Sequence, residues 1–332
     1  MSEIDVSIVM PALNASSTIG EALASCLDQT LRSIEVIVVD DGSKDDTAKV
    51  VERVARRADL PIRLIRHENR GRGAARDTGV AAARGRFIGF VDSDDVADPE
   101  MYSLLLGRAL ETESDVVVCG YVSFDSNTGE TMHLYGEGSS TMYGTGLLGN
   151  PDLLTVVSSS VCNKIFRRDL FERARIRFPS GDFEDLAVTY PLLLAAHRIE
   201  KVDRILYRYR RGQATSIMST HDDRYFLIFD ALSDVNAAFA RAEAGRATHA
   251  QLEWLNIVHA LSGRVGDLLR SPDAALVESY VRAAHAHLDA TFPTWRNRLR
   301  RDSSFGRLPK RLLLLDPRTA RFAARALRKT PS

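Results

Sequence analysis

The chain has 332 residues, of which 45% are hydrophobic and 27% charged, and its 44 Lys and Arg balance its 44 Asp and Glu. These proportions are those of a globular protein and argue against a disordered chain. No run reaches the roughly 18 uncharged apolar residues that a membrane-spanning helix needs, and the start MSEIDVSIVM lacks the basic region of a secretion signal. Three separated cysteines, Cys26, Cys119 and Cys162, fit reduced thiols. We therefore expect a cytoplasmic protein.

The charge is unevenly distributed along the chain. Residues 295–332 hold twelve Lys or Arg and two Asp, a net charge of +10, against −10 in the first 294 residues. Arg318, Arg321, Arg325 and Arg328 recur at helical spacing, which predicts a basic amphipathic tail that binds an anionic membrane surface, such as the inner face of the cell membrane. A solvated, partly packed helix is the alternative. The acidic body argues against nucleic-acid binding.

The first 120 residues alternate short β-branched runs with helical stretches. Strands are expected at Val6–Met10, Ile34–Val39, Ile62–Ile65, Phe87–Val91 and Val116–Val118. Helices are expected at Ser16–Gln29, Asp45–Arg57, Arg72–Arg84 and Asp98–Leu110, the last beginning with a capping Asp followed by Pro. Strands that are apolar on both faces and separated by helices predict an α/β fold with a mostly parallel, Rossmann-like sheet covered by helices on both faces.

The rest of the chain falls into three stretches. Residues 121–150 are rich in glycine and polar residues, which predicts a hairpin or long irregular loops. A strand at Ile165–Phe171, a helix at Leu186–Ala196 and a strand at Val202–Tyr209 would return to the sheet. Beyond about residue 220 the pattern is helical. We expect a domain over 1–219, with halves 1–120 and 121–219, then a helical region over 220–332.

Acidic residues cluster where two predicted strands end. Asp40 and Asp41 follow the second strand, and Asp92, Asp94 and Asp95 follow the fourth. In parallel sheets such ends converge and bind ligands, and grouped carboxylates repel one another unless a cation or hydrogen-bond donors offset their charge. Their oxygen atoms favour Mg²⁺ or Mn²⁺. Aspartates that only cap helices and close turns are the alternative. A receiver-type phosphoacceptor also clusters acids, but it is about a third of this length.

Several segments resemble family-two glycosyltransferases of the A-type (GT-A) fold, over about residues 4–217. The donor-side segments are SIVMPALN (7–14), VIVVDDGSKDDT (36–47), ENRGRGAARDTGVAAARG (68–85) and FIGFVDSDD (87–95), which contains the Asp-x-Asp motif. The acceptor-side segments are VCNKIFRRDLF (161–171), GDFEDLAVTYPLL (181–193) and LYRYRRGQATSI (206–217). The resemblance implies an inverting, hexosyltransferase-type enzyme of cell-envelope or exopolysaccharide synthesis.

The resemblance also implies a role for individual residues. Asp94 would be the principal ligand of Mn²⁺ or Mg²⁺, and Asp185 the general base. The nucleotide-sugar site would comprise Pro11, Ala12, Asn14, Asp40, Asp41, Asn69, Gly71, Arg76, Asp92 and Ser93. Among these, Asp41 would accept a hydrogen bond from the nucleotide base. Lys164, Glu184, Arg210 and Arg211 would contact the acceptor or the phosphates. The alternative for Arg76 is a solvated helix residue with no ligand contact, and for Lys164 a surface charge.

These roles define a reaction. A cation on Asp94 would neutralise the departing diphosphate, while Asp185 takes the proton of the attacking hydroxyl. The donor would be a nucleoside diphosphate sugar, with UDP resting on the resemblance, and the acceptor a glycan, a polyol polymer or a lipid-linked sugar. A catalytically silent nucleotide-sugar binder or scaffold is the alternative function. A sugar-nucleotide pyrophosphorylase would need an Arg-Lys glycine-rich loop after the first strand, and a dehydrogenase a Gly-x-Gly-x-x-Gly there; neither is present. Oligomerisation stays open.

Overall fold

The computed structural model of the chain describes residues 3–126, 128–136, 143–211, 222–269, 271–301 and 317–320. It divides into two compact units, Met1–Gln213 and Ala214–Ser332. Within the described ranges, no helix is both long and apolar enough to cross a bilayer.

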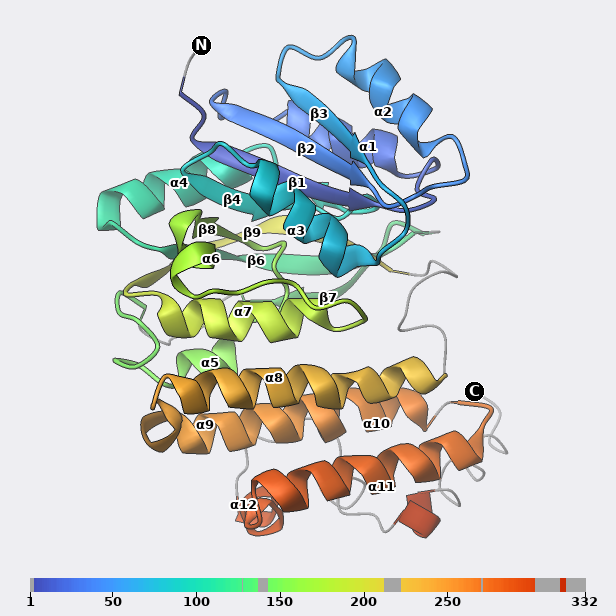
Figure 1. Cartoon of the computed structure of the whole chain (residues 1–332), viewed down its shortest axis with the longest axis vertical. Helices are drawn as coiled ribbons and strands as arrows, with labels where there is room; N and C mark the ends of the chain where they lie inside the picture. Colours follow the sequence, from blue (N-terminus) through green and yellow to red (C-terminus); the bar gives the residue numbers. More distant parts are fainter. Residues whose placement is uncertain are drawn as a thin grey trace. The chain divides into compact units, whose positions relative to one another are not determined.

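The first unit contains all the strands of the described chain (Figure 1). They are β1 (Val6–Ala12), β2 (Ile34–Asp40), β3 (Ile62–Arg66), β4 (Phe87–Phe90), β5 (Val96–Ala97), β6 (Val116–Asp125), β7 (Thr131–Tyr135), β8 (Lys164–Arg167) and β9 (Ile199–Arg211). Its helices are α1 (Ile19–Leu27), α2 (Thr47–Ala55), α3 (Arg72–Ala82), α4 (Met101–Thr112), α5 (Leu153–Val156), α6 (Asp169–Arg173) and α7 (Glu184–Ala195).

The strands form one mixed sheet in the order β3-β2-β1-β4-β8-β6-β9-β5, with β7 beside β6 (Figure 1). The predicted parallel pairing holds from β3 to β4. The second half is different: β8 runs antiparallel to β4 and β6, β7 to β6 and β5 to β9, whereas β6 and β9 are parallel. Every residue of β1 and β2 is buried, as their Val- and Ile-rich sequences predict for strands covered on both faces. The carboxyl ends of β1, β2 and β4 therefore meet at one edge.

Some predicted boundaries were wrong. Helix α4 begins at Met101, three residues after the expected Asp98, because Asp98 accepts from the Glu100 N–H in a turn before the helix. The expected strand Ile165–Phe171 ends at Arg167 and gives way to α6. Conversely, β6 continues to Asp125, because its polar second half pairs with both β7 and β9. Pairing partners distant in sequence decide these boundaries, and local composition does not report them.

The second unit is helical throughout its described part, as predicted. It comprises η2 (Asp223–Phe226), α8 (Leu227–Arg241), α9 (Gly245–Ile257), a π-helical turn at Val258–Ser262, α10 (Gly263–Leu268), α11 (Ala274–Thr291) and α12 (Trp295–Arg301). The start of the basic tail is packed: Trp295 is buried and its indole N–H donates to Asp289 at 2.8 Å. The predicted amphipathic tail helix lies mainly in 302–316 and 321–332, outside the described residues.

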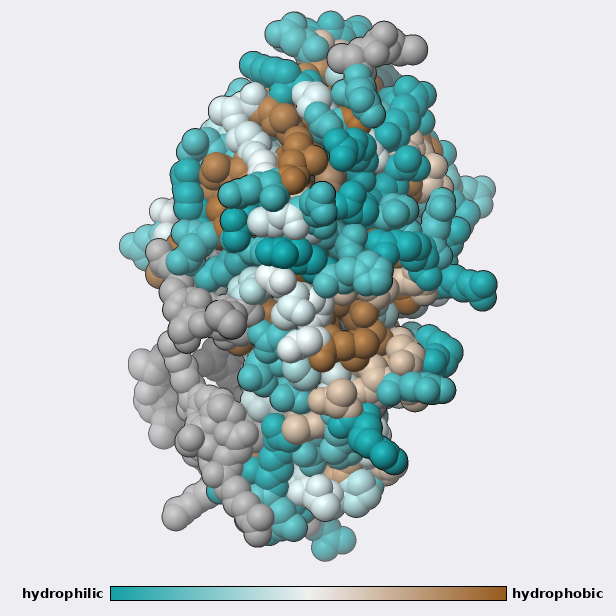
Figure 2. Space-filling view, turned by 90° about the vertical axis from the view of Figure 1, so that its left-hand side faces the viewer, coloured by the Kyte–Doolittle hydropathy of each residue, from teal (hydrophilic) through white to brown (hydrophobic). Residues whose placement is uncertain are grey.

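Hydrophobic residues on the surface are dispersed. On the face in Figure 2, hydrophilic residues predominate and hydrophobic ones form a few separate groups. Within the described residues, Met132 and Leu134 are exposed together on β7, and the other exposed large apolar side chains come from different elements and loops: Leu13, Leu110, Leu148 and Val156. Exposure of single apolar side chains is ordinary for soluble proteins.

Two helical glycines offer a matched test of packing in this fold. A Cβ at Gly79 in α3 would lie 2.3 Å from Val9 Cγ1 in β1, whereas one at Gly107 in α4 would meet nothing within 4 Å. We expect Gly79→Ala to lower the free energy of unfolding by about 1–3 kcal/mol through overpacking. Gly107→Ala should raise it by about 0.5–1 kcal/mol through helix propensity. Urea unfolding measures both, and equal effects would contradict the close packing of α3 on β1.

Candidate active site

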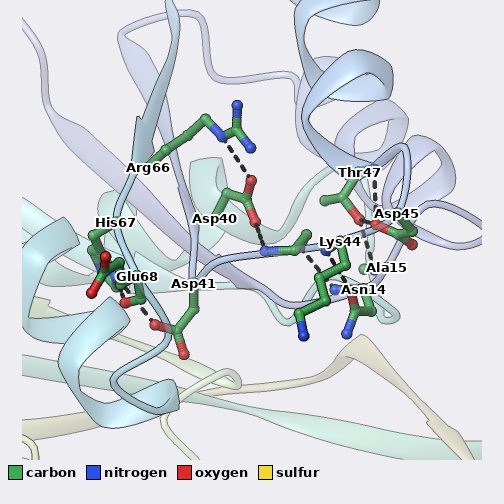
Figure 3. Close-up of polar contacts among 11 residues, drawn as sticks. Asn14, Ala15, Asp40, Asp41, Lys44, Asp45, Thr47, Arg66, His67 and Glu68 are labelled. Atoms are coloured by element: carbon green, nitrogen blue, oxygen red, sulfur yellow. Dashed lines mark hydrogen bonds and ion pairs between the residues drawn. The ribbon is translucent and has the colours of Figure 1, made fainter.

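Two neighbouring aspartates at the end of β2 point in different directions (Figure 3). Asp40 accepts from the Ser43 N–H at 2.9 Å and from Arg66 Nε at 3.0 Å. Asp41 accepts from the backbone N–H groups of Arg70 at 2.8 Å and Gly71 at 2.9 Å. Gly71 has φ +91°, a conformation that favours glycine. The loop after β3 is therefore fastened to Asp41, directly before α3.

His67 completes the surroundings of Asp41. Its Nδ1 lies 3.2 Å from Asp41 Oδ1 and 2.8 Å from the Glu68 carbonyl oxygen (Figure 3). The carbonyl can only accept, so Nδ1 carries the hydrogen in this arrangement. The ring therefore lies against the same carboxylate oxygen that accepts from the Arg70 N–H, and sequence reasoning did not identify His67.

The loop after β1 lies against the end of β2. Pro11 and Ala12 are buried at the end of β1, and the Ala12 carbonyl accepts from the Asp41 N–H at 2.9 Å. Asn14 has φ +50°, donates its N–H to Ser43 Oγ and accepts from the Lys44 N–H through Oδ1, both at 2.9 Å. Asn69 is exposed. These predicted donor-site residues share one edge of the sheet with Asp41.

The loop after β4 holds its acids in different environments. Asp95 is fully buried and accepts from Tyr207 Oη at 2.6 Å and the Arg210 N–H at 2.7 Å. Asp92 forms an ion pair with Arg76 at 2.7 Å. Ser93 and Asp94 are half-buried, and no side chain of the described chain donates a hydrogen bond to the Asp94 carboxylate. The Asp94 carboxylate thus differs from those of Asp92 and Asp95, which are engaged by side chains of the protein.

Electrostatics separate the same three acids. Burial raises the pKa of Asp94 to about 6, and the negative charge of Asp92 adds to the shift. Burial also pushes the pKa of Asp92 upward, but Arg76 and Arg72 together hold it below its usual value. Burial, reinforced by Asp94 and Asp92, raises the pKa of Asp95 well above its usual range. A cation at Asp94 would relieve this repulsion.

Arg76 joins the two halves of the first unit. It lies in α3, is 2% exposed, and pairs through one terminal nitrogen with Asp92 and through the other with Glu184, at the start of α7. Arg72, one turn earlier, lies 3.9 Å from Glu184. The alternative of a solvated helix residue is therefore wrong for Arg76. Its guanidinium faces protein carboxylates, and its role toward ribose or phosphate stays a prediction.

Asp185 follows Glu184 in the first turn of α7. Its Oδ1 accepts from the Leu186 N–H at 2.8 Å, and its side chain is half-buried. Burial raises its pKa to about 6, Glu184 adds to the shift and Arg76 opposes it. A carboxylate with a pKa near the working pH is suited to accept a proton.

Two of the predicted cations are engaged within the protein. Lys164 is 0% exposed, so the alternative of a surface charge is wrong; it donates to the Ser158 carbonyl at 3.1 Å, to Asn163 Oδ1 at 2.6 Å and to the Ser160 carbonyl. Burial lowers its pKa to about 8. Arg210 donates to the Asp94 carbonyl at 2.6 Å and to Glu21 at 2.5 Å. Both side chains brace loops beside the acids.

Arg211 differs from these cations. Its guanidinium carbon lies 5.8 Å from the centre of the Tyr209 ring, and its buried Nε has no hydrogen-bond partner in the described chain. Tyr207, which the sequence analysis placed only within the expected strand Val202–Tyr209, donates to Asp95 and also accepts from the Asp92 N–H at 3.2 Å. Its role depends on the register between β9 and the loop after β4, which local sequence does not reveal.

Comparison with known proteins identifies this arrangement. Residues 7–175 match the family model described as glycosyl transferase family 2. The chain belongs to this family. It is 33% identical to EpsH of Bacillus subtilis, named as a glycosyltransferase, over 243 residues, which are 70% of this chain and 68% of EpsH. It is 29% identical to the succinoglycan biosynthesis protein ExoO of Rhizobium meliloti over 257 residues, 72% of this chain and 69% of ExoO.

A solved structure shows the same fold. TarS of S. aureus, residues 1–349 in complex with UDP-GlcNAc, superposes with a TM-score of 0.73 at 22% identity, covering 98% of this chain and 92% of that one. The mixed sheet with its helices is therefore the GT-A fold, followed by a helical C-terminal region. The family-2 chain is a glycosyltransferase enzyme.

The Arg76 ion pairs generate a prediction about stability and pH. In Arg76→Met, Asp92 and Glu184 would stay buried without their cation, which costs about 3–5 kcal/mol of unfolding free energy. Without Arg76 the folded-state pKa of Asp92 rises above its unfolded value, so stability is lost as pH rises through the new pKa. Wild-type Asp92, with its low pKa, stays ionised from pH 5 to 8. The deficit should therefore be larger at pH 8 than at pH 5.

Urea unfolding in EDTA at both pH values measures this deficit. The control is Arg72→Met, because Arg72 is about half-exposed and 3.9 Å from Glu184, and it should cost much less. An equal deficit at pH 5 and 8, or an equal cost for the two variants, would contradict the assigned role of Arg76.

Proposed function

We propose that this family-2 glycosyltransferase moves a sugar from a UDP-sugar to a hydroxyl of a glycan, polyol polymer or lipid-linked acceptor in cell-envelope or exopolysaccharide synthesis. The observation that carries the proposal is that Arg76 pairs with both Asp92 and Glu184. Asp92 lies in the expected nucleotide-sugar half (1–120), and Glu184 precedes Asp185 in the expected acceptor half (121–219). The UDP-GlcNAc bound by TarS and the succinoglycan role in the name of ExoO support the donor and pathway classes.

The nucleotide would bind at the edge formed by the ends of β1 and β2. Asp41 already accepts two backbone N–H groups, but an ionised carboxylate offers about four lone-pair sites. It therefore retains capacity for an N–H of the nucleotide base, beside Pro11, Ala12, Asn14 and the exposed Asn69. Asp40 is occupied by Ser43 and Arg66, and we assign it to holding the loop.

The acidic loop after β4 fits a divalent cation of the hard, oxygen-binding type. In the described residues no three His, Cys, Asp or Glu side chains group as a metal cage, and Mg²⁺ is commonly held by one or two carboxylates together with substrate phosphates. We propose Asp94 as the protein ligand, with Asp92 and Ser93 beside the ribose or donor sugar. Mn²⁺ or Mg²⁺ bound there would offset the negative charge that develops on the diphosphate.

Asp185 would act as the general base. It takes the proton of the acceptor hydroxyl as that oxygen attacks the anomeric carbon and the bond to the diphosphate breaks. With a single displacement the configuration at the anomeric carbon inverts. Arg211, with its free Nε, is the cation we assign to the phosphates, whereas Lys164 and Arg210 hold loops.

The basic tail completes the proposal. The twelve Lys and Arg of residues 295–332 support peripheral attachment at the inner face of the cell membrane, where lipid-linked acceptors are presented. The alternative is a catalytically silent nucleotide-sugar binder. Such a protein would not require a carboxylate whose pKa is raised to about 6, as that of Asp185 is.

Substitution of the base is the experiment that tests this function. Asp185→Asn should lower transfer by about 10²–10⁴-fold, since an amide cannot accept the proton, while UDP affinity measured by calorimetry stays near the wild-type value. The wild-type rate should rise with pH through about 6, where Asp185 ionises. The control is Asp169→Asn, an exposed acid on α6. Near-normal turnover by Asp185→Asn would rule out the base assignment.

A further inference from the structure

One face of the strands β7, β6 and β9 is lined by aromatic side chains. Tyr121 on β6 lies opposite Tyr135 on β7 and Tyr207 on β9. Two residues further along β6, Ser123 lies opposite His133 on β7 and Tyr209 on β9. Directly opposed residues project to the same face of a sheet, so these side chains form one row from the sheet edge toward the acidic loop.

The outer part of this row is a stacked platform. The Tyr121 and Tyr135 rings lie 4.5 Å apart and 9° from parallel, and His133 meets Tyr135 edge-on at 6.2 Å. His133 is exposed and both tyrosines are half-buried, so solvent reaches part of the rings. Hydroxyl groups border the platform where Tyr121 Oη lies 3.4 Å from Ser158 Oγ, and both of these residues are half-buried.

The inner part of the row reaches the reaction site. Tyr207 bonds Asp95 and the Asp92 N–H. Burial raises the pKa of Tyr121 to about 12, and the negative charge of Asp185 contributes to the shift, so this tyrosine and the proposed base lie within electrostatic reach. Through Tyr207 the row is therefore joined to the acidic loop after β4, and the platform is at its outer end.

We propose that the Tyr121–Tyr135 platform is an acceptor subsite that binds a sugar ring of a glycan. The inference rests on the proposed function and narrows its acceptor class. The C–H face of a pyranose ring is apolar and packs on an aromatic ring, while its hydroxyls need polar groups at the border, such as Tyr121 Oη and Ser158 Oγ. An acyclic polyol polymer has no such ring face, so the platform favours a glycan.

The test uses the full chain in the presence of UDP, applied to a printed array of bacterial oligosaccharides. Tyr135→Ala should bind the recognised oligosaccharides at least about fivefold more weakly, because truncating a buried contact tyrosine removes most of its contact area. Tyr135→Phe keeps the ring and should retain binding. The matched control is Leu134→Ala, since Leu134 is 58% exposed on the opposite face of the same strand. If Tyr135→Ala does not fold, His133→Ala replaces it.

UDP calorimetry on the same proteins distinguishes failure of the acceptor subsite from failure of the proposed function. Loss of oligosaccharide binding in Tyr135→Ala alone, with UDP binding unchanged, supports the subsite. Equal binding by Tyr135→Ala and wild type overturns it, as does a wild-type protein that binds UDP but no oligosaccharide. Absence of both ligands from the wild type overturns the proposed function together with the subsite.

Discussion

A single buried guanidinium sets the geometry on which this enzyme depends. Burying a charge is costly unless it is paired, and Arg76 is paired on both sides, with Asp92 after β4 and with Glu184 at the start of α7. These partners come from segments far apart in the sequence of the first unit. The planar fork of arginine can serve two carboxylates at once, so it fixes the distance between the loop after β4 and the Glu184-Asp185 pair.

The remaining acids differ in the hydrogen-bond donors that their carboxylates already have. Asp40, Asp41 and Asp95 all accept hydrogen bonds from backbone N–H groups and so hold loops in place. Arg66 also donates to Asp40 and Tyr207 to Asp95, and His67 Nδ1 lies 3.2 Å from Asp41. Asp94 receives no side-chain donor within the described chain, and burial, together with the negative charge of Asp92, raises its pKa to about 6. An acidic cluster that serves only as turns and caps would satisfy all its members. Asp94 is therefore the acid to which we assign the cation.

The sequence predicted the parallel half of the sheet and the edge where the acids gather, because buried Val- and Ile-rich strands and strand-end aspartates are local signals. It did not predict the antiparallel strands around β8, since these depend on pairing with distant partners. Among site residues, the divergence of Asp40 from Asp41 follows from strand alternation. Composition and spacing do not determine cross-strand register. They therefore could not predict the burial of Lys164, the hydrogen bonds of Tyr207 or the stacking of Tyr121 on Tyr135.

The central claim is that the acidic edge binds a nucleoside diphosphate sugar through a cation on Asp94. A thermal-shift panel of nucleoside diphosphates and their sugars, run with Mn²⁺ and then with EDTA on the wild type and on Asp94→Ala, tests it most directly. We expect uridine nucleotides to raise the melting temperature of the wild type with Mn²⁺, and chelation or Asp94→Ala to remove the shift. Asp46→Ala, which removes an exposed acid of the neighbouring loop, should keep it. No shift with any nucleotide, or an equal shift in EDTA, would contradict the account.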